Sequence, residues 1–327
     1  MKPTSVRLHQ SKVNGSIEMT TKPTINRMDV LAEAHPRLPS HSVLSDYWAL
    51  TKPEVNTLIA VATFAGFYLG YPGRLGSFPF WSLIHTLAGT LLVASGTATL
   101  NQYLERRFDA QMRRTARRPL AAGRLRPESA LRFGILLSVT GEIYLAAAVN
   151  ALASLLAAIT LASYLFIYTP LKRKTPLCTL AGAFPGAMPP LIGWAAATGT
   201  LSLGAWVLYA MLFLWQFPHF MSIAWIYRED YARAGYLVLP RGERRGQFVA
   251  LGSILPLLFL LFVSIAPSLL GRVGPLYGIA ALVLASAFLY CGVQLVLHRS
   301  NAIAKRLLFA SIIYLPLAFA LMMVCKP

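Results

Sequence analysis

Three side chains whose oxygens could bind a metal ion lie four residues apart in the sequence: Asn101, Glu105 and Asp109. In a helix this spacing places them in one row, with about 6 Å of rise between neighbours. Such a row, called the oxygen row below, suits a hard cation such as Mg²⁺, which takes a few carboxylates and leaves other positions for substrate phosphates. The spacing therefore predicts a Mg²⁺ site with these three residues as ligands.

Four arginines follow directly: Arg113, Arg114, Arg117 and Arg118. A guanidinium binds phosphate oxygens in bidentate fashion. Acids that hold a metal beside arginines that hold an anion are typical of a site for a metal–diphosphate. The alternative is an ordinary charged loop between helices, in which the acids pair with the arginines.

The composition is that of a membrane protein. Of 327 residues, 56% are hydrophobic and 13% are charged, which is too apolar for a soluble protein of this size. The net charge of +18 does not indicate nucleic-acid binding, because the basic residues lie in short gaps between apolar segments. The three cysteines form no CxxC pair and indicate neither a disulfide framework nor a zinc site.

Nine segments are long and apolar enough to cross a bilayer as helices. We therefore predict an all-α, polytopic membrane protein. The third and fourth segments nearly touch at Asn150, which predicts a tight hairpin, and the fifth carries three prolines, which predict a kinked or broken helix. The segments are about 54–71, 80–104, 130–149, 151–170, 177–197, 203–226, 248–269, 275–297 and 305–324.

The gaps between these segments alternate in charge. One side carries 27 of the 30 Lys and Arg residues. The positive-inside rule then places the N-terminus and the oxygen row on the cytoplasmic side of the cell (inner or plasma) membrane, and the C-terminus outside. Residues 1–45 are polar and predict a disordered cytoplasmic tail, and residues 46–327 predict a single membrane domain.

Three further polar stretches face the same side: 50–54, 168–175 and 215–235. Interfacial anchoring explains most such residues in membrane proteins. Most acids of the membrane part also lie on this side, which anchoring does not require.

These motifs resemble those of a known protein family. The pattern of 101–120 resembles the first acidic motif of membrane prenyltransferases of the UbiA type. Residues 168–194, with Gly-Ala-Met-Pro-Pro-Leu-Ile-Gly-Trp, and 215–235, with Trp-Gln-Phe-Pro-His-Phe and Tyr-Arg-Glu-Asp-Tyr, are similar to the subgroup that farnesylates haem. The resemblance covers about 46–324.

The resemblance implies nine helices around a central cavity. It implies that farnesyl diphosphate and haem b are the substrates, that Mg²⁺ is required, and that haem O passes to a haem A synthase or a terminal oxidase. Diphosphate ligands would come from Arg113, Arg114, Arg117, Lys172 and Arg173. The Tyr168 ring would face the allylic cation, although packing is the commoner role of such aromatics.

Where many relatives carry a second Asp-x-x-x-Asp motif, this sequence has Glu229 and Asp230, with Tyr227 and Tyr231 at the fourfold positions. Tyr227 and Asp230 are candidates for this second loop, although a second metal there is in doubt. His219 is a candidate haem ligand, since haem iron takes axial histidine. The alternative for His219 is a hydrogen-bonded interior histidine.

Two other functions remain open from the residues. A sister prenyltransferase would act on a quinone precursor, and the identity of the acceptor would separate the two. A secondary transporter would place its ionisable site at the midplane between repeated halves. Here the charged residues gather at one rim, which favours the enzyme.

Overall fold

The computed structural model describes residues 42–326, with the exception of residues 74, 241 and 243, and contains helices and no strand in that part of the chain. The first helices are α2 (Val43–Leu50), α3 (Pro53–Gly70), η1 (Leu75–Ser77), α4 (Phe80–Asp109), α5 (Pro127–Ala148) and α6 (Ala151–Ala162). They are followed by η2 (Ser163–Tyr168), α7 (Thr169–Leu171), α8 (Cys178–Gly186) and α9 (Pro189–Thr198). The last are α10 (Leu203–Ile226), α11 (Arg228–Arg233), α12 (Arg244–Leu269), α13 (Pro275–His298) and α14 (Asn301–Val324).

Seven helical segments in the described part of the chain are long and apolar enough to cross a membrane, so the chain is a multi-pass membrane protein. The predicted count of nine is not confirmed. The predicted first segment is the 18-residue α3, which carries Glu54 and Asn56 near its start. The predicted fifth segment is divided into α8 and α9, each too short to span alone.

Two local predictions about these helices are confirmed. Asn150 separates α5 from α6, and its side chain accepts a hydrogen bond of 2.8 Å from the Ala153 N–H, which caps α6. Between α8 and α9 the helix stops at Ala187 and Met188, because Pro189 begins the second helix and cannot continue the first. The three cysteines are free.

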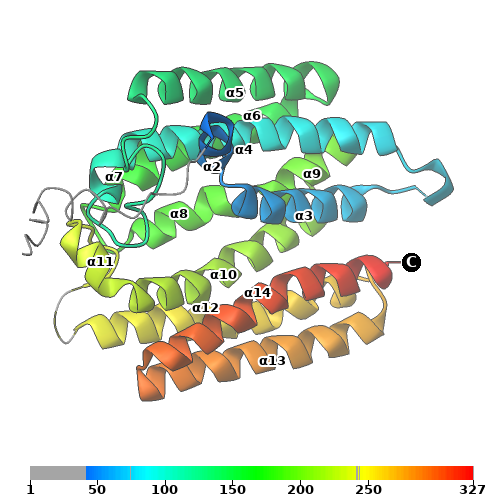
Figure 1. The fold of residues 1–327 in the computed structure, drawn as a ribbon. Helices are drawn as coiled ribbons and strands as arrows, with labels where there is room; N and C mark the ends of the chain where they lie inside the picture. Colours follow the sequence, from blue (N-terminus) through cyan, green and yellow to red (C-terminus); the bar gives the residue numbers. More distant parts are fainter. Residues whose placement is uncertain (1–41, 74, 241, 243, 327) are drawn as a thin grey trace, which may run out of the picture. The chain divides into compact units, whose positions relative to one another are not determined.

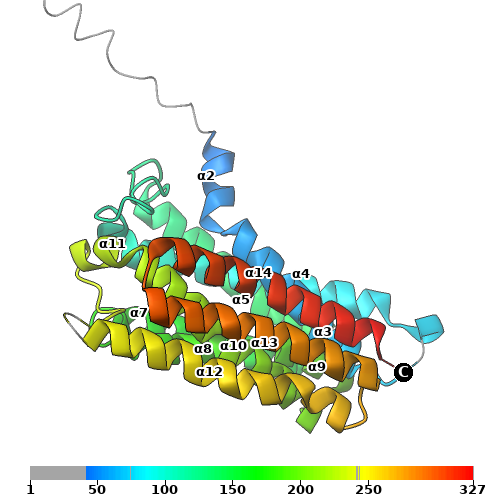
Figure 2. The ribbon, with the colours of Figure 1, turned by 90° about the horizontal axis from the view of Figure 1, so that it is seen from below.

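The helices run side by side, with α12, α13 and α14 on one side of the bundle and α4, α5 and α6 on the other (Figures 1 and 2). Glycine allows the closest approach, between α3 and α9: a Cβ on Gly193 would lie 2.0 Å from the Thr63 carbonyl oxygen. The last helix, α14, packs against both α10 and α3. Beyond it, the Lys326 ammonium donates to the carbonyls of Tyr68 and Tyr71 at 2.7 and 2.6 Å, at the end of α3.

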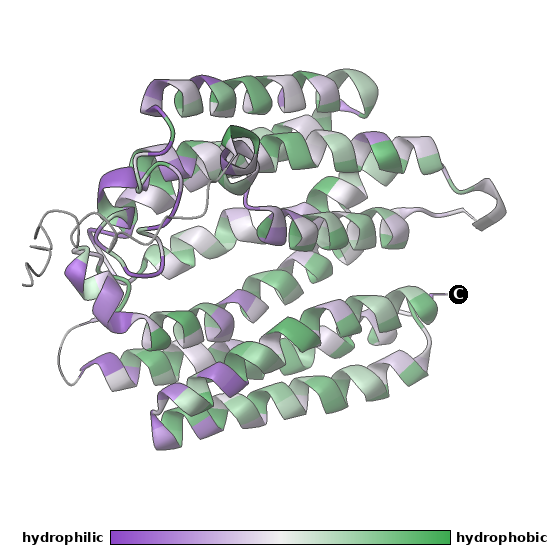
Figure 3. Cartoon of the chain, viewed as in Figure 1, coloured by the Kyte–Doolittle hydropathy of each residue, from purple (hydrophilic) through white to green (hydrophobic). Residues whose placement is uncertain are grey.

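Hydrophilic residues gather at one end of the bundle, where α4 ends and α11 lies (Figure 3). We call this the site end. It carries residues 110–126 between α4 and α5, and residues 172–177 between α7 and α8. Residues 110–126 are tied to α2, since Arg124 Nε lies 3.0 Å from both carboxylate oxygens of the buried Asp46. The predicted disordered tail lies outside the described residues apart from 42–45, where α2 begins.

Candidate active site

The oxygen row occupies the last turns of α4, in a helix as the spacing predicted. Asn101, Glu105 and Asp109 are 1%, 5% and 2% exposed. Buried carboxylates are costly unless a positive charge or several hydrogen bonds compensate them. The neighbours of the row therefore decide what it can do.

A different cation contacts each member of the row. Lys52 Nζ donates to Asn101 Oδ1 at 3.1 Å, and Lys172 Nζ donates to both oxygens of Glu105 at 2.9 and 3.1 Å. Arg118 Nη1 lies 2.8 Å from Asp109 Oδ2. Within the row, pairing with a loop arginine thus holds for Asp109 alone, while Glu105 pairs with a lysine 67 residues away.

These cations depend on the acids electrostatically. Burial lowers the pKa of the Lys172 ammonium, but the charge and hydrogen bond of Glu105, together with Tyr168 and Tyr164, outweigh burial and hold that pKa well above its usual value. Burial and the charges of Arg118 and Lys172 lower the pKa of Lys52 to about 7, although Glu105 and Asp109 act in the opposite direction. The site end therefore concentrates positive charge that an anionic ligand would stabilise.

Lys52 is also unusual in its backbone. Its φ of 52° lies in the left-handed region, which costs free energy for a residue with a side chain. Pro53 begins α3 directly after it. This junction turns the Lys52 side chain toward α4, where it reaches Asn101.

The second loop, residues 227–231, contacts residues 110–126 through Asp230 and Arg114. The Arg114 N–H donates to Asp230 Oδ2 at 3.4 Å, and Arg233 Nη1 donates to Asp230 Oδ1 at 3.0 Å. The Arg114 guanidinium lies over the rings of Tyr227 and Tyr231, with centroid distances of 5.0 and 5.8 Å. Asp230 is thus a partner of arginines at the rim of the site.

Lys172 and Arg173, which follow the fourth predicted segment, each contact an aromatic ring. Lys172 Nζ lies 4.4 Å from the centroid of the Tyr168 ring, so the predicted aromatic is within reach of the oxygen row. The Tyr168 ring packs against α8 at Gly182, where a Cβ would lie 2.6 Å from it. Arg173 lies over the Phe108 ring at 4.2 Å.

Not every predicted residue joins the site. Arg113 and Arg117 are exposed, and their side chains make no hydrogen bond or ion pair with a described residue. The sequence placed Arg118, which contacts the row, among the four arginines able to bind phosphate, but the list of diphosphate ligands left it out and gave Lys52 no role. The position of Lys52 before a proline at the start of an apolar segment was the available signal for it.

His219 lies on α10 and faces α14. Its Nδ1 lies 2.8 Å from Ser311 Oγ, and its ring stacks on Trp215 with a centroid distance of 4.7 Å. The Trp215 indole N–H donates to the Ser311 carbonyl at 2.8 Å. These contacts support the alternative of a hydrogen-bonded interior histidine.

We expect His219→Ala to lower thermal stability by about 1–3 kcal/mol, through the lost hydrogen bond and packing. The Soret band of haem added to the purified protein should keep its position, since we expect a structural role. Absorbance spectra and thermal unfolding of the variant and the wild type test this. A displaced Soret band together with lost activity would assign His219 as a haem ligand instead.

Oxygen donors of the row fit Mg²⁺ by their chemistry, since this hard cation prefers carboxylate and amide oxygens. Within residues 42–326, apart from the gaps, no three His, Cys, Asp or Glu side chains form a group that could hold a metal ion. Asn101 would supply a third oxygen ligand beside the carboxylates of Glu105 and Asp109. Binding a metal here requires Lys52, Lys172 and Arg118 to give up their present partners.

The chain is a helical membrane bundle with acids and cations gathered at one end, an arrangement that a membrane-embedded transferase acting on an anionic substrate can use. The family model of the UbiA prenyltransferase family matches residues 59–313. The chain therefore belongs to the UbiA prenyltransferase family and is a prenyltransferase.

Relatives similar in sequence carry a more specific name, protoheme IX farnesyltransferase. The protein of that name from Solibacter usitatus is 48% identical over 290 residues, which cover 87% of this chain and 99% of the relative. Those from Salinibacter ruber and Aquifex aeolicus are 45% and 38% identical, and the matches cover 86% of this chain and 99% and 96% of the relatives.

Solved structures share the fold. A digeranylgeranylglyceryl phosphate synthase has a TM-score of 0.70 at 15% identity, with 86% of this chain and 98% of that chain covered. A UbiA homologue from Archaeoglobus fulgidus, bound to GPP and Mg²⁺, has a TM-score of 0.60 at 15% identity, with 85% and 99% covered. At these identities the likeness establishes the fold alone.

Proposed function

We propose that this chain transfers the farnesyl group of farnesyl diphosphate to a vinyl group of haem b to make haem O. The observation that carries the proposal is the buried oxygen row, with a separate cation on each of its members, at one end of a membrane bundle. The names of the relatives support haem b as the acceptor.

Asn101, Glu105 and Asp109 would hold Mg²⁺. The binding of GPP and Mg²⁺ by the UbiA homologue from Archaeoglobus fulgidus supports a requirement for Mg²⁺. When bound, Mg²⁺ neutralises the diphosphate, which makes it a better leaving group.

The cations of the site then have two roles. While no substrate is bound, Lys52, Lys172 and Arg118 compensate the oxygen row. With Mg²⁺ held by the carboxylates, these cations would be free to hold oxygens of the departing diphosphate, with Arg114 and the exposed Arg113 and Arg117 at the rim. Positive charge fixed in advance at that place favours ionisation.

Farnesyl transfer to haem b breaks one bond of the donor and forms two bonds on the acceptor. The allylic C–O bond breaks and the diphosphate leaves with the electron pair. A vinyl carbon of haem b bonds to the allylic carbon, water adds to the other vinyl carbon, and one proton is released. The face of Tyr168 can stabilise the allylic cation, and the apolar bundle keeps other water molecules away.

The charge alternation supports an active site on the cytoplasmic side of the cell membrane, with the N-terminus inside and the C-terminus outside. Residues 46–327 would act as one domain in the lipid bilayer. Downstream, haem O would be consumed by a haem A synthase or during assembly of a terminal oxidase.

Expression of the chain followed by extraction of haems tests the acceptor and the donor together. We expect a product in which a hydroxyethylfarnesyl group replaces one vinyl group, so that its mass exceeds that of haem b by one farnesyl group and one hydroxyl group. A membrane-inserted protein that gives only prenylated quinone precursor would establish the sister activity. Failure with every prenyl diphosphate would favour a transporter.

A further inference from the structure

A cavity of about 600 Å³ opens at the site end between α4 and the segment formed by η2 and α7. Its volume lies in the range of small-molecule sites. Glu105 of the oxygen row lines it, so it borders the place where the diphosphate would ionise. We call this cavity the lateral pocket.

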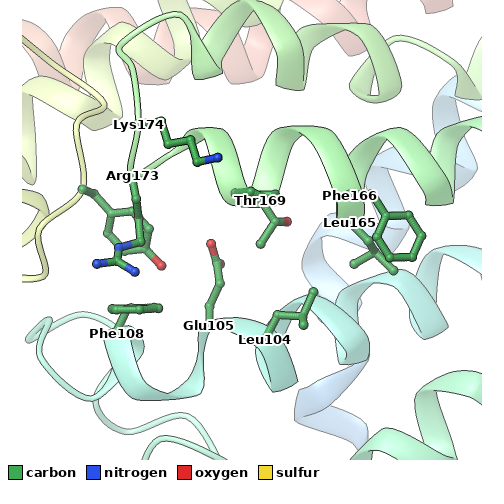
Figure 4. A pocket seen from close by; sticks show the side chains of 10 residues that line it. Leu104, Glu105, Phe108, Leu165, Phe166, Thr169, Arg173 and Lys174 are labelled. Atoms are coloured by element: carbon green, nitrogen blue, oxygen red, sulfur yellow. The ribbon is translucent and has the colours of Figure 1, made fainter.

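The lateral pocket has an apolar half and a polar half (Figure 4). Leu104, Leu165 and Phe166 form the apolar half, nearer the middle of the bundle. Leu104 and Phe166 are 45% and 73% exposed on the outside of the bundle, which is the side that lipid would cover. An apolar molecule can therefore reach the pocket from the bilayer.

Two exposed cations, Arg173 and Lys174, form part of the polar half. Neither makes an ion pair with a described residue, although Arg173 stacks on Phe108. Three other cations already serve the oxygen row: Lys52, Lys172 and Arg118. Arg173 and Lys174 thus remain available for a different anion.

We propose that the lateral pocket binds the porphyrin acceptor, with Arg173 and Lys174 pairing with its two propionates. The inference rests on the proposed function and names the subsite for its second substrate. Haem has the amphipathic shape that the pocket requires: an apolar macrocycle with two carboxylates on one edge. With its propionates at the rim, its opposite edge lies among Leu104, Leu165 and Phe166.

This placement revises the role that the sequence suggested for Arg173. A diphosphate ligand is expected to contact the oxygen row, as Lys172 and Arg118 do, whereas Arg173 lies over the Phe108 ring. Arginine pairs with carboxylates in bidentate fashion, so a propionate suits it as well as a phosphate. The lateral pocket also keeps the two anionic substrates on separate sets of cations.

Titration of the purified full-length protein with haem b and with its dimethyl ester, followed in the Soret region, tests the proposal. The ester keeps the macrocycle and removes the propionate charge. We expect wild type to bind haem b at least about tenfold more tightly than the ester. Arg173→Gln/Lys174→Gln should remove this preference by weakening haem b alone, and Arg173→Lys/Lys174→Arg should restore it.

Lys305→Gln/Arg306→Gln is the matched control, because it removes two adjacent exposed cations elsewhere in the chain. It should keep the wild-type preference. Unchanged ester binding in Arg173→Gln/Lys174→Gln shows that this variant is folded.

Two results would overturn the inference. One is an unchanged preference in Arg173→Gln/Lys174→Gln. The other is a raised KM for farnesyl diphosphate with unchanged affinity for haem b, which would return these cations to the diphosphate. In both cases wild type still makes haem O, so the proposed function stands; wild type that makes no farnesylated haem would overturn both.

Discussion

Asp109→Asn is expected to lower kcat/KM for farnesyl transfer by about 1,000-fold or more, while the protein stays folded in the membrane. The change removes the charge with which Asp109 would bind Mg²⁺, and almost no volume. Its partner Arg118 has a side chain that is 26% exposed, so water can solvate the freed guanidinium. The hydrogen bond of 2.8 Å from Thr115 to the Asp109 backbone carbonyl does not involve the carboxylate and remains.

Steady-state assays of haem O formation, with thermal unfolding of the same samples, measure both parts of this result. Glu128→Gln is the matched control, because it makes the same change at an exposed acid in the first turn of α5. It should keep wild-type activity. Full turnover by Asp109→Asn would remove Asp109 from the metal site.

Lys172→Met should abolish turnover and also destabilise the protein in the absence of substrate. The Lys172 and Glu105 side chains are 13% and 7% exposed, so the change leaves a buried carboxylate without its cation. Breaking a buried ion pair from one side costs roughly 3–5 kcal/mol. Adding Glu105→Gln removes the orphaned charge and should restore much of that stability, although not activity.

Thermal unfolding of wild type, both single variants and the double variant in one detergent gives the coupling energy. A coupling of about 2 kcal/mol or more between Lys172 and Glu105 is expected. Additive effects of the two substitutions would show that the pair contributes little. Comparison of each variant with and without Mg²⁺ adds a second readout, since a metal on Glu105 would replace the missing ammonium in Lys172→Met.

The features that the sequence predicted well are determined by residues that lie close together in the sequence. The spacing of Asn101, Glu105 and Asp109 defines one face of α4 whatever surrounds it. Prolines identify the break between α8 and α9 in the same way, since Pro189 has no N–H to continue α8. Hydropathy located the membrane segments, although a helix as polar at its start as α3 falls outside the spanning set.

The partners of the oxygen row could not be predicted in this way. Lys52 is 49 residues from Asn101, and Lys172 is 67 residues from Glu105, so their contacts arise only when helices pack. Residues 110–126 have no regular period that would say which arginine turns inward. Arg113, Arg117 and Arg118 are equal in type and proximity, yet only Arg118 reaches an acid of the row.

The contact of Lys326 with the end of α3 sets an order for biogenesis. The ammonium holds carbonyls of Tyr68 and Tyr71, which precede it by 258 and 255 residues. Helix α3 therefore lacks one of its fixed neighbours until synthesis has reached Lys326. Because α3 begins directly after Lys52, which contacts Asn101, substrate binding should be weaker in chains that end before Lys326 than in the chain that includes it.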